Sequence, residues 1–128
     1  MSQNTDATAG ADALGDQLIS LSAKEVGGSC LVTVAGEIDM VTTPTLRAFL
    51  QKQLEQPASL LVIDLTGVRF LGSSGLAVLV ETLGAARERH VGLRLVCSSR
   101  EVTRPLEVTG LTELFEIHPD PGTALAPN

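Results

Sequence analysis

The chain has 128 residues, 44% of them apolar, which suits one globular domain with one hydrophobic core. Its formal charge is −6, and its aromatic residues are three Phe, without Trp or Tyr. This charge would repel a phosphate backbone, and bases would find few rings to stack on, so we expect no direct binding of nucleic acid.

The N-terminal part predicts a tail followed by a β-hairpin. Residues 1–16 are polar and acidic, without periodicity and without the basic and apolar segments of a signal peptide. Two short apolar or alternating runs, 18–22 and 30–35, flank Gly27-Gly28, which is typical of two antiparallel strands joined by a tight turn.

A helix and a central strand follow. Thr43 precedes Pro44, and apolar residues recur at helical spacing as far as Leu54. This pattern predicts Thr43 as the N-cap, a proline at the first helical position and an amphipathic helix that Pro57 ends. Residues 60–65 form a near-continuous apolar run, which is typical of a strand covered on both faces.

The clearest helix begins after the turn Gly72-Ser73-Ser74-Gly75. Apolar residues then recur at positions i, i+3, i+4 and i+7, and the pattern ends near His90 with basic residues in the last turns. Residues 91–98 alternate as a further inner strand.

The C-terminal part predicts a third helix, a last strand and a tail. Ser99 can cap a helix that stops at Gly110 in a left-handed conformation. Pro105 falls inside this helix, where a missing hydrogen bond costs about 3 kcal/mol. Residues 114–117 form the last strand, and 119–128, with three Pro and one Gly, are expected to be a flexible tail with at most one weak helical turn.

The predicted domain spans residues 17–118 in the order β-β-α-β-α-β-α-β. This is an α/β domain with a mixed β-sheet and helices packed on it. Ligand sites in such folds lie at the carboxyl ends of strands, where loops enter helices. Two loops occupy this position, Gly36-Glu37-Ile38-Asp39 and the segment from Phe70 to Leu76.

In the second loop, Ser73 and Ser74 stand at a helix N-terminus between small residues, which leaves them accessible to the active site of another protein. A phosphate placed there would face free backbone N–H groups. The structural alternative is that one serine caps the helix while the glycines permit a tight turn. Spacing alone favours this alternative.

Catalysis finds little support. A serine-hydrolase elbow reads Gly-x-Ser-x-Gly, whereas Gly72 and Gly75 enclose only two residues, and no pattern positions His90 or His118 as its base. Nucleotide-binding motifs are missing from the sequence, so we expect no cofactor.

Three carboxylates are better explained by local structure than by catalysis. Glu37 and Asp39 follow a strand, where Asp39 can orient the turn. Asp64 closes an apolar strand and can hold backbone in a following Thr66-Gly67 turn.

Cys30 and Cys97 lie in separate apolar runs without zinc-site spacing, which predicts two buried free thiols. The longest uncharged apolar stretch, 70–80, has about half of the roughly 20 residues that a membrane span needs. We therefore expect a cytoplasmic protein without a membrane partner.

Four motifs in order resemble the STAS domain family, specifically the bacterial anti-sigma factor antagonists. The resemblance covers about residues 17–118. The motifs are Gly36-Glu37-Ile38-Asp39, the run Val62-Ile63-Asp64-Leu65-Thr66-Gly67-Val68-Arg69-Phe70-Leu71, Ser73-Ser74-Gly75-Leu76 and Val108-Thr109-Gly110-Leu111.

This resemblance implies a partner switch without enzymatic activity. The unphosphorylated protein would bind an anti-sigma factor that is also a serine kinase, which releases a sigma factor, and phosphorylation would end the binding. A serine phosphatase is implied as a further partner. The family's phosphoacceptor falls on Ser73, with Ser74 as the fallback, and its strand-end aspartate falls on Asp39.

The partner surface implied by the resemblance comprises Glu37, Asp39, Gly72, Ser73, Ser74 and Gly75. Two departures from the family pattern are Gly72, where the family often has Asp, and Pro105. We expect a phosphate to act by repulsion and steric block near Glu37 and Asp39 while the fold is preserved.

Two other readings stay open. The first is a STAS scaffold or ligand-sensing module without a phosphorylation cycle, which Gly72 favours. The second is an enzyme with Ser73 or Ser74 as its nucleophile.

Overall fold

The computed structural model describes residues 18–127, and the N-terminal tail predicted for residues 1–16 lies outside them. Its elements, in chain order, are β2 (Ile19–Val26), β3 (Ser29–Ile38), α2 (Thr43–Leu54), β4 (Leu60–Leu71), α3 (Ser73–Glu88), β5 (Gly92–Val96), α4 (Arg100–Val108), the short 3-10 helix η2 (Leu111–Glu113), β6 (Glu116–His118) and α5 (Pro121–Leu125). The predicted α/β order is confirmed.

Five strands form one sheet in the order β2-β3-β4-β5-β6. Strand β2 pairs antiparallel with β3 through the predicted hairpin, whose Gly27 and Gly28 both have positive φ. The remaining neighbours pair in parallel. The sheet is therefore mixed, and the carboxyl ends of β3, β4 and β5 lie at the same edge.

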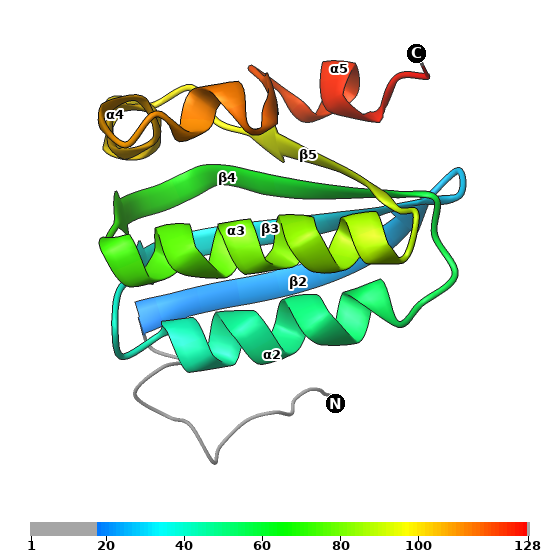
Figure 1. Cartoon of the computed structure of the whole chain (residues 1–128), viewed down its shortest axis with the longest axis horizontal. Coiled ribbons are helices and arrows are strands. Elements are labelled where there is room, and N and C mark those ends of the chain that lie inside the picture. Colours follow the sequence, from blue (N-terminus) through cyan, green and yellow to red (C-terminus); the bar gives the residue numbers. More distant parts are fainter. Residues whose placement is uncertain (1–17, 128) are drawn as a thin grey trace.

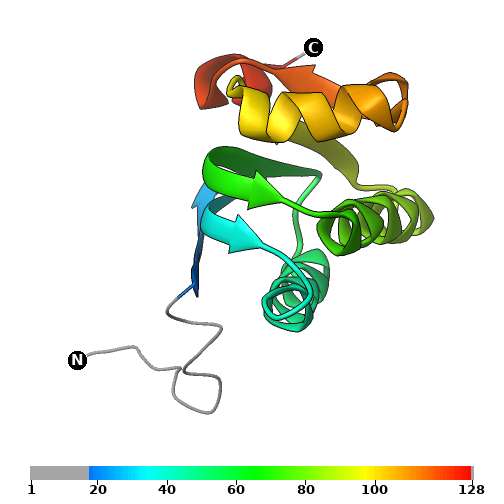
Figure 2. The same cartoon turned by 90° about the vertical axis from the view of Figure 1, so that its left-hand side faces the viewer.

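Helices cover both faces of the sheet (Figures 1 and 2). Helices α2 and α3 lie side by side on one face, and α4 and α5 lie over the other. The main core is aliphatic, with fully buried residues such as Val32, Leu46, Ile63 and Leu79. In a smaller cluster, Ala124 of α5 packs with Leu31, Val62 and Val96 of the sheet. Aliphatic strands covered on both faces explain the continuous apolar runs in the sequence.

Strand β4 is longer than predicted. It continues from residue 60 to residue 71 instead of stopping near 65, and the expected Thr66-Gly67 turn is part of the strand. Its pairing with β3 shifts register twice, where Leu65 and Thr66 together oppose Val34 and where Arg69 is an extra residue. These β-bulges allow a long strand to bend without leaving the sheet.

The ends of the helices differ from prediction in two places. The N-cap of α2 is Thr42 instead of Thr43, which is already helical. At the C-terminus, the segment expected to be a flexible tail contains α5, in which Asp120 caps the helix through the backbone N–H of Thr123 and Ala124 is buried. Helix α4 runs through Pro105 as predicted, and Gly110 after it has a φ of 76°.

Candidate functional site

The two loops chosen from the sequence meet at one edge of the sheet. Ile38 and Leu71, the last residues of β3 and β4, are paired, and the N–H of Gly72 donates to the carbonyl of Ile38 over 2.9 Å. Helices α2 and α3 consequently begin at the same end of the molecule, on the left of Figure 1. Parallel pairing brings together Asp39 and Ser73, although 34 positions separate them in the sequence.

Neither serine in the first turn of α3 caps the helix. Gly72 is the N-cap, and its carbonyl accepts hydrogen bonds from Gly75 (3.0 Å) and Leu76 (3.1 Å). Since Gly72 has no side chain, the helix has no side-chain cap, and the structural alternative of a capping serine does not hold. Ser73 is exposed and Ser74 is half-buried. The first backbone N–H groups of a helix have no acceptor within the helix, so Ser73 lies beside free donors at this terminus.

The loop between β3 and α2 is held by two side chains. Asp39 Oδ1 accepts hydrogen bonds from the N–H groups of Val41 (2.9 Å) and Thr42 (3.1 Å). The Thr42 hydroxyl accepts from the N–H of Asp39 (2.9 Å) and donates to the carbonyl of Glu37 (2.8 Å). Asp39 therefore orients the turn, and this Asx-type bonding fixes the loop.

Thr42 is a residue that the sequence analysis missed. It is completely buried, and its hydroxyl points back to the strand instead of forward into the helix that it precedes. The spacing of an aspartate at a strand end and a threonine three positions later is the signal that could have revealed it.

Three exposed apolar side chains surround the site and were also missed. Met40 and Val41 lie in the loop before α2, and Phe70 lies near the end of β4. Beside Phe70, Glu37 forms a weak ion pair with Arg69 (3.9 Å), and both side chains are substantially exposed. Such a pair contributes little to stability because solvent screens it.

Comparison with known proteins identifies the family. The sequence model of the STAS domain family matches residues 20–124 of this chain. The chain belongs to the STAS domain family. This STAS domain is 37% identical to the anti-sigma-B factor antagonist of Listeria monocytogenes over 86 residues. The alignment covers 67% of this chain and 75% of the relative. The anti-sigma-B factor antagonist of Bacillus subtilis is 32% identical over 99 residues, 77% of this chain and 90% of the relative.

Solved structures agree. The crystal structure of an anti-sigma factor antagonist from Mycobacterium paratuberculosis superposes with a TM-score of 0.76 and 35% identity, covering 84% of this chain and 91% of that one. The anti-sigma factor antagonist SpoIIAA in its unphosphorylated form shares the fold, with a TM-score of 0.68 and 15% identity over 81% of this chain and 92% of that one.

His90, His118 and Asp64, the other residues considered for catalysis, lie apart from the serines in this STAS domain. His90 follows the far end of α3, and His118 lies on β6, where its Nε2 is 2.9 Å from a Glu116 carboxylate oxygen. Asp64 Oδ1 accepts a hydrogen bond from the N–H of Thr66 (3.0 Å), inside the first bulge of β4. Neither histidine is placed to activate Ser73, and Asp64 is engaged in holding backbone.

Residues 18–127 offer neither a metal site nor a membrane span. These residues include no group of His, Cys, Asp and Glu that could hold a metal ion. None of the helices in that range has the length and apolar character required to cross a bilayer.

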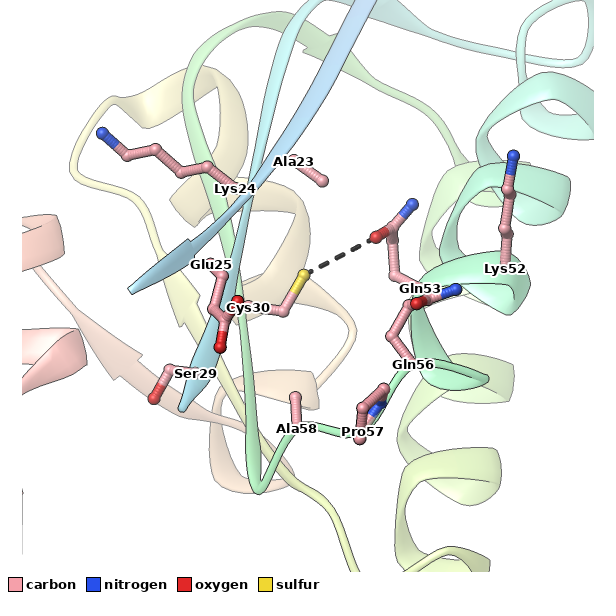
Figure 3. Close-up of a pocket in the computed structure, with 10 residues that line it drawn as sticks. All are labelled: Ala23, Lys24, Glu25, Ser29, Cys30, Lys52, Gln53, Gln56, Pro57 and Ala58. Atoms are coloured by element: carbon pink, nitrogen blue, oxygen red, sulfur yellow. Dashed lines mark hydrogen bonds between the residues drawn. The ribbon is translucent and has the colours of Figure 1, made fainter. Parts of the chain in front are cut away.

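A separate cavity of about 410 Å³ lies near the opposite end of β3 (Figure 3). It is bordered by the hairpin of β2 and β3 and by the end of α2, and the Cys30 thiol donates to Gln53 Oε1 over 3.7 Å at its wall. Both cysteines are buried and free, as predicted. Burial raises the pKa of both thiols, that of Cys97 to about 11, so they remain protonated at neutral pH.

Proposed function

We propose that this STAS domain is an anti-sigma factor antagonist. In its unphosphorylated form it binds an anti-sigma factor that is also a serine kinase, and the sigma factor is released. Phosphorylation of Ser73 ends this binding, and a serine phosphatase restores it. The protein is a substrate and ligand of its partners and not an enzyme, and it acts in the cytoplasm. The names of its relatives support the general role.

The observation that carries the switch is the exposed Ser73 hydroxyl at the start of a 16-residue helix whose N-cap has no side chain. A phosphoserine brings about −1.5 to −2 charges. The helix dipole and the free N–H groups of the first turn accommodate this charge, so the fold survives. The phosphate would stand at the same edge as Glu37 and Asp39, where its bulk and the cost of removing its hydration shell oppose close approach of a partner.

Ser73 is the favoured acceptor over Ser74. Ser73 is exposed, whereas Ser74 is half-buried, and Gly75 behind it is buried against β3. A kinase must reach the hydroxyl with its bound ATP, so the exposed serine reacts with less distortion of the turn.

The test is incubation of the protein with ATP and each candidate anti-sigma kinase from the same cell. The phosphosite is located by mass spectrometry, and pull-down is measured before and after the reaction. We expect one phosphate on Ser73 in the wild type, none on Ser73→Ala, and loss of binding after the reaction. Ser74→Ala serves as the matched control and should still be phosphorylated. A phosphate on neither serine would end the proposed switch.

The same experiment distinguishes the alternative of a scaffold or ligand-sensing module. Gly72, at the position where an acidic residue is frequent in this family, and the cavity beside Cys30 favour this alternative. Binding that persists in the Ser73→Ala, Ser74→Ala double variant, without phosphate on the wild type, would support it. Stoichiometric labelling of Ser73 or Ser74 by a serine-hydrolase reagent would instead indicate an enzyme.

A further inference from the structure

Met40, Val41 and Phe70 form what we call the apolar patch. These three residues are 82%, 53% and 51% exposed to solvent, respectively. Within residues 18–127 the exposed large hydrophobic side chains number six, so half of them belong to the two segments that border the Gly72-Ser73 turn. Exposed apolar side chains that gather in one place, beside polar residues, mark an interaction surface.

Specific backbone contacts hold these side chains outward. Met40 and Val41 lie in the loop that Asp39 Oδ1 fixes through two hydrogen bonds. Phe70 follows the extra residue Arg69 of the second bulge. Val68 and Leu71 are both buried, so the bulge reverses the alternation of the strand and turns Phe70 away from the core. The exposure is therefore built into the fold.

The patch adjoins the turn that carries Ser73. The Phe70 ring lies 3.1 Å from the position that a Cβ atom on Gly72 would occupy, and Gly72 is bonded to Ile38, two residues before Met40. Glu37 is paired with Phe70 across the two strands, and Asp39 precedes Met40. Apolar side chains and carboxylates thus alternate around this edge of the sheet.

We propose that the apolar patch anchors the anti-sigma factor, with Met40, Val41 and Phe70 inserted into an apolar depression that is rimmed by basic side chains opposite Glu37 and Asp39. This inference rests on the proposed function. Aromatic residues and Met are enriched at protein interfaces, where a few fully desolvated side chains carry most of the binding free energy. An anionic lipid surface fits less well, because the adjoining carboxylates and the net charge of −6 would be repelled.

The proposal also explains how one phosphate could end the binding. A phosphate on Ser73 would stand beside a surface that must lose its water when the partner binds, and desolvation of a doubly charged group is costly. The switch would then act on the same contacts that hold the complex together.

The test compares affinities of purified variants for the anti-sigma factor from the same cell, measured by calorimetry. Met40→Ser and Phe70→Ser are each expected to raise the Kd about tenfold or more. Val108→Ser is the matched control, because Val108 is 74% exposed at the end of α4, and its Kd should stay within about twofold of wild type. Met40→Leu keeps the apolar contact and should bind nearly as well as wild type.

Circular dichroism and thermal unfolding verify that each variant is folded. If the wild type binds and the patch variants bind equally well, the inference is wrong and the proposed function stands. A wild type that binds no anti-sigma factor would remove the proposed function and this inference with it. Sedimentation of the wild type with phosphatidylglycerol vesicles, lost in Phe70→Ser, would assign the patch to lipid and overturn the proposal.

Discussion

Gly75 and Ile38 are in direct contact, the α-carbon of the glycine lying against the side chain of the isoleucine. A Cβ atom on Gly75 would overlap Ile38 Cγ2 and would come within 2.8 Å of Leu71 Cδ1. The first turn of α3 therefore packs directly on the ends of two strands, and this contact fixes the position of Ser73. The small residue two positions after Ser73 is thus required by packing.

Gly75→Ala is expected to destabilise the protein by about 1 to 3 kcal/mol, because the added methyl overpacks a closed contact. Gly84 lies in the same helix with no atom within 4 Å of its would-be Cβ, so Gly84→Ala should stabilise by about 0.5 to 1 kcal/mol. Urea unfolding of both variants measures the difference. Equal effects would mean that helix propensity, and not the contact with Ile38, determines the outcome.

A second prediction concerns the role of Asp39. Its Oδ1 needs only to accept two backbone N–H groups, and an amide oxygen can do the same. Asp39→Asn should therefore change the unfolding free energy by less than about 0.5 kcal/mol, whereas Asp39→Ala leaves two N–H groups without this acceptor and should cost about 1 to 2 kcal/mol. Chemical denaturation of the two variants in parallel is the measurement. If Asp39→Asn lost as much unfolding free energy as Asp39→Ala, the charge itself would stabilise the loop.

Local patterns predicted much of this fold. The hairpin around Gly27-Gly28, the apolar runs that form the strands and the start of α3 depend on residues that are close in sequence, and the structure confirms them. The length of β4 was missed because its bulges arise from pairing with β3, a long-range contact that alternation within one strand does not report. The exposure of Phe70 is a consequence of the same bulge.

The site was predicted to the level of its loops but not of its contacts. The motifs located both loops at the ends of strands, whereas the burial of Thr42 depends on hydrogen bonds that close only in the folded chain. Similarly, α5 was expected to be no more than one weak helical turn in a tail because of the Pro and Gly residues there, although its attachment depends on a buried arginine from β5.

That arginine supports a third prediction. Arg94 is 6% exposed, and its Nη1 donates to the carbonyls of Ala124 (2.8 Å) and Ala126 (2.9 Å), while its Nε pairs with Glu116. Removal of residues 120–128 would withdraw both acceptors and uncover the small cluster beneath α5. We expect a loss of about 2 to 4 kcal/mol in unfolding free energy, measured by urea unfolding. The truncated protein should also bind more of the dye ANS, because apolar surface is exposed.

A shorter deletion is the control for this truncation. Removal of residue 128 alone leaves α5 and both acceptor carbonyls in place as amides, so its unfolding free energy should match that of the full chain. If the longer deletion were equally neutral, α5 would contribute nothing to the stability of the sheet.

The last prediction concerns alkaline pH. Cys97 is 4% exposed, and burial raises its pKa from 9.0 to about 11 in the folded protein. An unfolded thiol loses its proton at lower pH than the folded one, so the contribution of the protonated thiol is complete below pH of about 9 and declines as pH rises toward 11. The difference in unfolding free energy between wild type and Cys97→Ala should therefore shrink over this interval. Urea unfolding of both proteins at several pH values tests this, because Cys30, whose pKa is also raised by burial, is present in both. A difference that stays constant from pH 8 to pH 11 would contradict the raised pKa.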